Sequence, residues 1–188
     1  VDLEALRKER DSEGCSMIPN AGIMVFSYED GNYQIQQVPV EPENFIYHVE
    51  DKTVHFYYVR HGETLFNHYN RMQGRSDSPL TAQGIEQVKL SAKALRNINF
   101  AFAYCSSAER ARDTASYILE SHDISAVPNQ DLREINFGTY EARVRDSIMD
   151  ELYERFNPCV NFSDVGGESE EQVIERIQRI LTLVLARA

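Results

Sequence analysis

The stretch of residues 56–64 limits what this chain can fold into more than any other part of the sequence. An apolar, β-prone run over residues 53–59 ends abruptly in a cation, an imidazole and a glycine, at Arg60, His61 and Gly62. Charged groups that directly follow a buried strand lie at the rim of a sheet, because the apolar interior cannot solvate them. The sequence therefore predicts a core strand over residues 53–59. It also makes His61 a candidate functional residue, although a single histidine in this position is more often structural.

Beyond this strand, the sequence alternates between apolar stripes at helical spacing and short β-prone runs. The predicted elements are helices that begin after Thr81, near Glu109, around residues 148–156 and after residues 167–169, and strands over residues 100–105 and 124–127. Such alternation predicts an α/β fold, a three-layer sandwich with a mostly parallel central sheet flanked by helices. The carboxyl ends of parallel strands share one edge, so we expect His61 and the start of the helix near Glu109 at the same rim.

A β-hairpin is predicted ahead of this core. Residues 23–28 and 33–38 are β-prone runs on either side of a turn that contains Asp30 and Gly31. This dipeptide readily adopts the positive φ angles of a tight turn. We expect the hairpin at the edge of the sheet, with Pro39 ending the strand pairing.

Composition narrows the class of protein. The 188 residues suit a single domain, and a net charge of −11 argues against nucleic acid and anionic membranes as partners. No apolar run is long enough to span a bilayer, and no signal-peptide pattern is visible. The three cysteines, Cys15, Cys105 and Cys159, form no metal-binding pattern, which favours buried thiols in a reducing compartment. We therefore expect a cytoplasmic protein.

Five short motifs occur in a fixed order from residue 60 onward. They are Arg60-His61-Gly62-Glu63-Thr64 with Asn67; Gln73-Gly74 with Asp77, Pro79-Leu80-Thr81 and Gly84; Ser106-Ser107 with Arg110-Ala111 and Thr114-Ala115; Leu132-Arg133-Glu134-Ile135 with Phe137-Gly138; and Gly167-Glu168-Ser169. This ordered series resembles the histidine phosphatase superfamily, the phosphoglycerate mutase-like enzymes. The resemblance covers residues 53–188, and its specificity comes from the order and spacing of the motifs together.

The resemblance implies that His61 is a nucleophile that accepts a phosphoryl group, with Glu134 as the general acid. A phosphoryl group carries about two negative charges, and guanidinium groups neutralise and orient it through paired hydrogen bonds. Arg60 and Arg110 are the expected clamps. Glu134 has to stay protonated near neutral pH, which requires partial burial or nearby negative charge. The residues implied to bind the phosphate or the substrate are Asn67, Gln73 and Gly74.

The predicted activity is hydrolysis of a small phosphorylated substrate without a metal or another cofactor. A phosphatase is preferred to a mutase because the stretch between Arg110 and Glu134 is short. Two alternatives remain open: phosphoglycerate mutase-type transfer, and a member of the fold that binds phosphorylated ligands without turnover. A metal hydrolase is disfavoured because no cluster of histidine and carboxylate residues has ligand spacing. A homodimer is compatible with this reading.

One expected feature of the family is missing. The superfamily has a second catalytic histidine, on a His-Gly that follows a late strand, but only His61 precedes a glycine here. Residues 18–31 resemble the hairpin that normally follows that second His-Gly. We hypothesise a permuted order within one domain, with residues 1–51 resembling the family's C-terminal helix end and hairpin, and residues 52–188 forming the core up to the helix before the missing strand. The chain as written is then expected to be weakly active or inactive.

Overall fold

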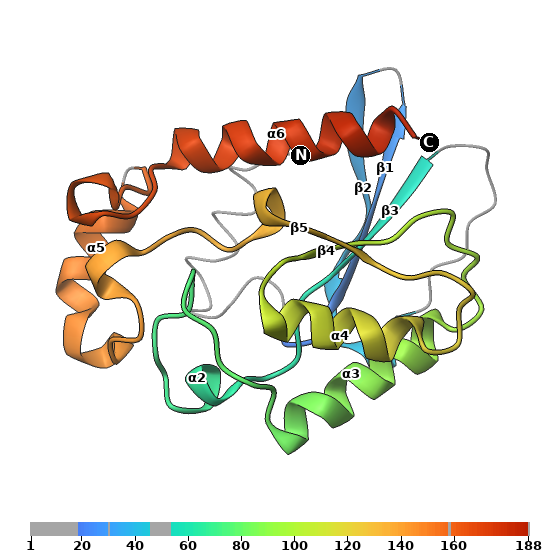
Figure 1. Ribbon diagram of the computed structural model, residues 1–188, viewed down its shortest axis with the longest axis horizontal. Helices are drawn as coiled ribbons and strands as arrows, with labels where there is room; N and C mark the ends of the chain where they lie inside the picture. The colour runs from blue at the N-terminus through green and yellow to red at the C-terminus, as the bar shows by residue number, and fades with distance from the viewer. Residues whose placement is uncertain (1–18, 30, 46–53, 158, 188) are drawn as a thin grey trace.

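The computed structural model describes residues 19–29, 31–45, 54–157 and 159–187 (Figure 1). Its strands are β1 (Ile23–Glu29), β2 (Asn32–Val40), β3 (Val54–Val59), β4 (Tyr104–Ser106) and β5 (Val127–Asn129). The α-helices are α2 (Leu65–His68), α3 (Ala82–Leu95), α4 (Glu109–Leu119), α5 (Met149–Phe156) and α6 (Glu170–Leu185). Short 3₁₀ turns are η1 (Pro42–Asn44), η2 (Gln130–Leu132), η3 (Gly138–Tyr140), η4 (Arg145–Ile148) and η5 (Ser163–Val165). The helix end expected ahead of the hairpin and the proposed join between residues 51 and 52 lie outside the described residues.

Helix starts agree with the sequence prediction because they depend on local capping. Thr81 caps α3 by accepting a hydrogen bond from the Gly84 amide, and α4 begins at Glu109. Ser169 caps α6 in a reciprocal capping box with Gln172. The strands are shifted by a few residues from their predicted positions, with β5 at Val127–Asn129. Figure 1 shows α6 on the side of the molecule opposite α3 and α4.

The α/β class is confirmed, but the prediction of a mostly parallel central sheet is not. The sheet that carries β3 has the order β2-β1-β3, and both of its pairings are antiparallel, with Phe26 opposite Phe56. The parallel pairing in the described residues joins β4 to β5. The difference arises because the partner of β3 is the hairpin strand β1, not one of the strands that follow the helices. The hairpin thus lies beside the core strand, as predicted.

The hairpin turn has the expected glycine geometry, whereas Pro39 does not end the pairing. Gly31 has a φ of 85°, a conformation that costs glycine little. β2 continues through Pro39 to Val40, which pairs with Ile23. Proline is tolerated here because β2 is an edge strand and one row of its amides makes no ladder bonds.

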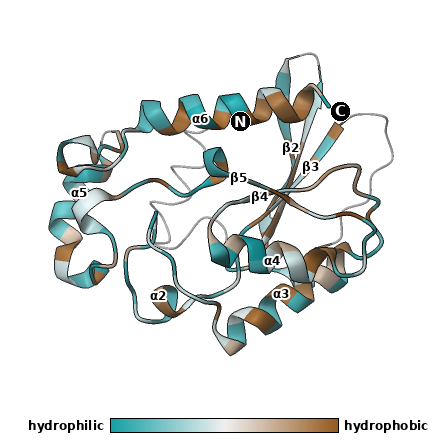
Figure 2. Ribbon diagram, in the orientation of Figure 1, coloured by the Kyte–Doolittle hydropathy of each residue, from teal (hydrophilic) through white to brown (hydrophobic). Residues whose placement is uncertain are grey.

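One hydrophobic cluster joins α3 and α4 to the sheet. Ile23 and Val25 of β1 are fully buried against Val88 and Leu95 of α3, and Ile118 of α4 completes the contact. Figure 2 shows hydrophobic residues on parts of the strands and also along α3 and α6. Burial of each such side chain stabilises the fold by about 1.5–3 kcal/mol, so this cluster fixes the strand that ends at residue 59.

A second cluster holds the segment that follows residue 134. Phe162 is fully buried and meets the rings of Phe137, Tyr140 and Phe156 edge-on, with centroids 5.1–5.6 Å apart. Edge-to-face contacts of this kind add to the stabilisation from burial. Residues 135–165 therefore have a core of their own beside the site.

The structure also bears on the expectations of buried cysteines and of no membrane-spanning segment. Cys105 is buried, as expected, but Cys159 is exposed, and both are free thiols. Within the described ranges, no helix is long and apolar enough to cross a membrane.

A close backbone approach fixes the loop after β3 on α3. A Cβ atom on Gly84 would lie 2.0 Å from the Glu63 carbonyl oxygen, and one on Gly62 would lie 2.4 Å from the Gly84 carbonyl oxygen. The Thr81 amide also donates to the Glu63 carbonyl at 2.9 Å. Because both contacts are with backbone atoms, a side chain at either position has to displace the loop or the helix.

We expect Gly84→Ala to lower the free energy of unfolding by about 1–3 kcal/mol, since overpacking outweighs the better helix propensity of alanine. The matched control is Gln83→Ala, at an exposed position in the same turn, which should change stability by less than about 0.5 kcal/mol. Denaturant titration measures both. Equal stability of the two variants would contradict the close contact.

Candidate functional site

His61 lies at the end of β3 with its ring oriented by its own loop. Its Nδ1 is 2.8 Å from the Gly62 carbonyl oxygen. A carbonyl can only accept, so Nδ1 carries the proton and, in the neutral ring, Nε2 has the free lone pair. Burial lowers the pKa of His61 to about 4, and the charges of Arg110 and Arg60 act in the same direction, against the Gly62 carbonyl and Asp77. The ring is therefore neutral at physiological pH and can act as a nucleophile.

The backbone around His61 is held from two sides. The Gly62 amide donates to the Thr114 hydroxyl of α4 at 3.3 Å. The turn before β1 binds on the other side, where the Ala21 amide donates to the His61 carbonyl at 3.0 Å. The start of the hairpin and α4 thus fix the nucleophile together.

Arg110, predicted as a phosphate clamp, is already bound to protein groups along one edge. Its side chain is 3% exposed. Nη1 donates to the Ser76 carbonyl at 3.1 Å and to Asp77 Oδ1 at 2.9 Å, and Nη2 donates to the Gly74 carbonyl at 3.0 Å. Three of the five guanidinium N–H donors are thereby used. The remaining two, on Nε and Nη2, leave one edge for an anion.

The N-terminus of α4 is capped from outside the helix. Ala108, the capping residue, makes no side-chain cap. Instead, Asp77 Oδ2 accepts from the Glu109 amide at 2.5 Å. Asp77 therefore orients Arg110 and occupies part of the helix end that the sequence had suggested for an anion.

Arg60, the second predicted phosphate clamp, lies within electrostatic reach of His61, Glu134 and Arg110. Burial lowers its pKa, opposed by the charges of Tyr58 and Glu134 and reinforced by those of Arg145 and Arg110. These charges act on Arg60 only if the groups lie near it. Arg60 and Arg110 thus lie near His61, and Arg145 lies near Arg60, in a chain whose net charge is −11.

Glu134 lies within electrostatic reach of Arg60, but the burial that was expected to keep it protonated is absent. Its side chain is exposed. Its carboxylate accepts a hydrogen bond from the next amide in the chain, that of Ile135, at 2.9 Å.

Thr64, to which the sequence assigned no role, orients two predicted binding residues. It is fully buried, and its hydroxyl lies 2.6 Å from Gln73 Oε1 and 3.0 Å from Asn67 Oδ1. The single hydroxyl proton is better placed for Gln73, and the Thr64 amide donates to Asn67 Oδ1 at 3.2 Å. With both oxygens occupied, the two amide nitrogens are the groups left for a ligand. Gln73 Nε2 is buried without a hydrogen-bond partner, which is costly unless an acceptor binds there.

Gly74 does not have a free backbone group for a phosphate. Its amide donates to Glu141 Oε2 at 3.1 Å, and its carbonyl accepts from Arg110. A Cβ atom at this position would lie 2.0 Å from the Ile135 carbonyl oxygen. Glycine is needed here for close packing and for holding Arg110, which corrects the predicted phosphate contact.

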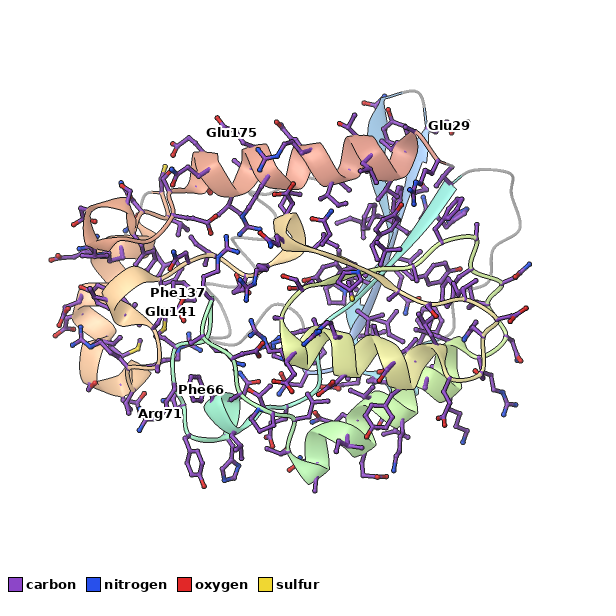
Figure 3. The ribbon with its side chains drawn as sticks, in the orientation of Figure 1. Glu29, Phe66, Arg71, Phe137, Glu141 and Glu175 are labelled. Carbon is purple, nitrogen blue, oxygen red and sulfur yellow. The ribbon has the colours of Figure 1, made fainter. Side chains whose placement is uncertain are left out.

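Sequence reasoning missed Glu141, which holds the loop of residues 74–76. Its carboxylate accepts from the amides of Gly74, Arg75 and Ser76, from the Ser76 hydroxyl and from the Phe137 amide. Glu141 and Phe137 lie side by side in Figure 3. Burial by itself would raise the pKa of Glu141, but these hydrogen bonds hold it below the usual value. A single Glu gives no sequence signal for such a role.

Arg176 of α6 was also missed, although a signal exists. It is 4% exposed and sits between Val173 and Ile177 on the apolar stripe of the helix. A cation inside an apolar stripe has to find buried partners. In the part of the chain that the structure describes, no cluster of three or more histidine, cysteine and carboxylate residues could hold a metal ion.

The comparisons with known proteins identify the family. The model of the histidine phosphatase superfamily (branch 1) matches residues 56–188. The chain belongs to this superfamily. A protein of Yersinia pestis named probable phosphoglycerate mutase GpmB is 43% identical over 129 residues, which are 66% of this chain and 60% of the relative. The chain thus covers less than two thirds of the length of this relative.

Solved structures agree with this assignment. YhfR of Bacillus stearothermophilus aligns with a TM-score of 0.61 and 31% identity, over 68% of this chain and 65% of that one. A mycobacterial glucosyl-3-phosphoglycerate phosphatase, solved with VO3, gives a TM-score of 0.61 and 27% identity, over 67% and 64% of the two chains. Relatives of this chain therefore bear both mutase and phosphatase names.

We expect the His61 ring to titrate at about pH 4 in the folded protein. The buried ring resists the proton that the unfolded chain accepts near pH 6.5. Folding therefore loses stability as the pH falls below 6.5, until the folded state also binds the proton. NMR of the ring resonances, assigned with His61→Gln, measures the titration. A ring that titrates near pH 6.5 would show that it is not buried as described.

Thr64→Val should destabilise the site, because the Thr64 hydroxyl donates to Gln73 Oε1 and accepts from the backbone amide of Asn67. Valine leaves both groups without this partner. The expected loss is about 1–3 kcal/mol in the free energy of unfolding. Thr64→Ser restores the hydroxyl and should recover most of that loss. Denaturant titration compares the two variants. A valine variant as stable as the serine variant would rule out the orienting role.

Proposed function

We propose that the protein is a phosphomonoester hydrolase that acts through a phosphohistidine on His61. The observation that carries this proposal is the neutral, half-buried His61 ring, with Nε2 free, beside the guanidinium groups of Arg60 and Arg110. A cationic setting around a neutral nucleophile suits attack on a dianionic phosphate.

In the first step, the phosphate binds between Arg60 and the free edge of Arg110, with amide hydrogen bonds from Asn67 and Gln73. Nε2 of His61 then attacks phosphorus, and the bond from phosphorus to the ester oxygen breaks. Glu134 gives its proton to the leaving oxygen, which departs as an alcohol. The phosphate dianion itself supplies the negative charge that favours the protonated form of Glu134.

In the second step, water attacks phosphorus and the bond to Nε2 breaks. The Glu134 carboxylate, deprotonated by the first step, takes a proton from this water. Inorganic phosphate leaves, and His61 returns to its neutral form with the proton still on Nδ1. The cycle consumes one ester and one water, and needs no metal or cofactor.

Phosphoglycerate mutase-type transfer is the second candidate, because relatives at 43% identity carry that name. The two activities differ in what accepts the phosphoryl group from His61: water in a phosphatase, and a hydroxyl group of the substrate in a mutase. We favour water because the stretch between Arg110 and Glu134 is short. The substrate class we propose is a small phosphate monoester, in a cytoplasmic protein.

We also propose that the complete catalytic site contains a second histidine, on a strand that this sequence lacks. In the described residues, β3 pairs with β1 and β4 pairs with β5, so each of β3 and β4 has one edge without a strand partner. The hairpin beside β3 is consistent with a permuted order, because that hairpin would then directly follow the missing strand.

A protein without that histidine is expected to be less active than one that contains it. Loss of one stabiliser of the transferring group commonly reduces the rate by ~10²–10³. The intact mass of the natural protein, compared with 21.6 kDa for this chain, shows whether further residues are present.

A labelled phosphate donor followed by an alkaline denaturing quench tests the nucleophile in the natural protein, because a phosphoryl group on histidine survives in base and is lost in acid. We expect acid-labile label on the wild type and none on His61→Ala. The matched control is His68→Ala, an exposed histidine of α2, which should label normally. Equal labelling of all three proteins would refute the assignment, and binding of phosphate without any label would favour the non-catalytic alternative.

A further inference from the structure

The buried guanidinium of Arg176 brackets the segment that carries Glu134. Nη1 donates to the carbonyls of Asp131 and Arg133, at 2.7 Å and 2.5 Å. Its Nε and Nη2 donate to the two carboxylate oxygens of Glu168, at 3.0 Å and 3.3 Å. Four N–H donors of one side chain are therefore committed, two of them to backbone just before Glu134.

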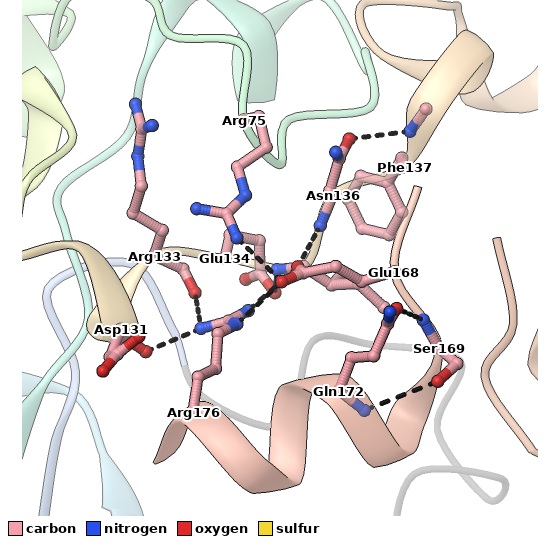
Figure 4. A network of polar contacts seen from close by, with 12 residues as sticks. Arg75, Asp131, Arg133, Glu134, Asn136, Phe137, Glu168, Ser169, Gln172 and Arg176 are labelled. Atoms are coloured by element: carbon pink, nitrogen blue, oxygen red, sulfur yellow. Dashed lines mark hydrogen bonds and ion pairs between the residues drawn. The ribbon is translucent and has the colours of Figure 1, made fainter. Parts of the chain in front are cut away.

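Glu168 completes the bracket on the other side. Its Oε2 accepts from the Asn136 amide at 2.8 Å, two residues after Glu134. Burial would raise the pKa of Glu168, but the Asn136 amide and the charges of Arg176 and Arg75 hold it below the usual value. The carboxylate is therefore charged at neutral pH, as a bidentate pair with Arg176 requires. Figure 4 shows the network and the Glu134 side chain beside it.

Glu168, which pairs with Arg176, also binds the loop that carries Gln73. Arg75 Nη2 donates to Glu168 Oε1 at 2.8 Å. Arg75 follows Gly74 in the loop that carries Gln73, so one carboxylate connects this loop, the Glu134 segment and α6. The Glu134 carboxylate instead accepts a hydrogen bond from the adjacent Ile135 amide.

We propose that Arg176 and Glu168 are positioning residues for Glu134, an inference that rests on the proposed role of Glu134 as general acid. Glu134 is exposed, so side-chain packing does not fix its direction. The backbone on both sides of it is fixed instead. A displacement of about 1 Å of a catalytic group can cost ~10²-fold in rate, which makes this bracket important for proton transfer to the leaving oxygen.

Arg176→Lys and Glu168→Gln separate positioning from general stability. Lysine keeps the charge but cannot serve two carbonyls and a carboxylate from one planar group. Glutamine keeps the shape and an acceptor for Asn136 but loses the ion pair. The controls are Arg179→Lys, on the exposed face of α6 where Arg179 pairs with the Asp131 carboxylate, and Glu171→Gln, at an exposed position in the first turn of α6.

The readout is the dependence of kcat/KM on the leaving group in the natural protein, because kcat/KM reports the first step, in which the phosphoryl group moves to His61, and not the later attack of water, in which Glu134 also acts. An alkyl phosphate needs a proton from Glu134, whereas dinitrophenyl phosphate releases a stable phenolate and needs little help. For Arg176→Lys and Glu168→Gln, we expect kcat/KM to fall at least about tenfold on ethyl phosphate and less than about threefold on dinitrophenyl phosphate. Glu134→Gln should show the same selectivity, and both controls should resemble the wild type.

Melting temperatures of all variants are measured first, and assays are run where each variant is folded. Equal losses on both substrates, or no loss on either, would overturn the positioning role. If Glu134→Gln itself shows no selective loss, the general-acid assignment fails, which is a separate result. If Arg176→Lys does not fold, Glu168→Gln alone decides between the outcomes.

Discussion

The ion pair between Arg110 and Asp77 is the interaction on which the geometry of the site depends. A buried guanidinium without partners would be strongly destabilising, so Arg110 draws the loop of residues 74–77 onto α4. Asp77 caps the same helix through the Glu109 amide, and Thr114 of that helix binds the Gly62 amide next to His61. Helix, loop and nucleophile thus form one unit before any substrate is present. Such preorganisation is what electrostatic catalysis requires.

Two further carboxylates stabilise the site without facing the substrate. Glu141 gathers the amides of residues 74–76, and Glu168 joins Arg75, Arg176 and the Asn136 amide. Hydrogen bonds and cations hold the pKa of both groups below their usual value. Their contribution to stability is therefore present at neutral pH and is lost as the pH falls through the lowered pKa. Ion pairs with carboxylates thus hold several arginine side chains close together in a chain whose net charge is negative.

The sequence predicted well those features that depend on neighbouring residues. Thr81 and Ser169 cap α3 and α6 through amides three residues away, so their roles follow from local spacing. The turn at Gly31 is predictable for the same reason. The pairing of β3 was not predictable from the sequence. Its partner β1 lies about thirty residues earlier in the chain, and the packing of β1 against α3 places it beside β3. An apolar run contains no information about which strand will lie beside it.

By itself, the sequence determined the family and the candidate reacting groups: an ordered set of motifs places the chain in its superfamily and singles out His61, Arg60, Arg110 and Glu134 as candidates. Only the tertiary structure decided how those groups are held. It showed that one edge of Arg110 is already occupied, that Thr64 turns two amides toward the site, and that Arg176 and Glu168 bracket an exposed Glu134. Hydrogen bonds between residues far apart in the chain depend on how helices and loops pack, and spacing along the sequence cannot reveal them.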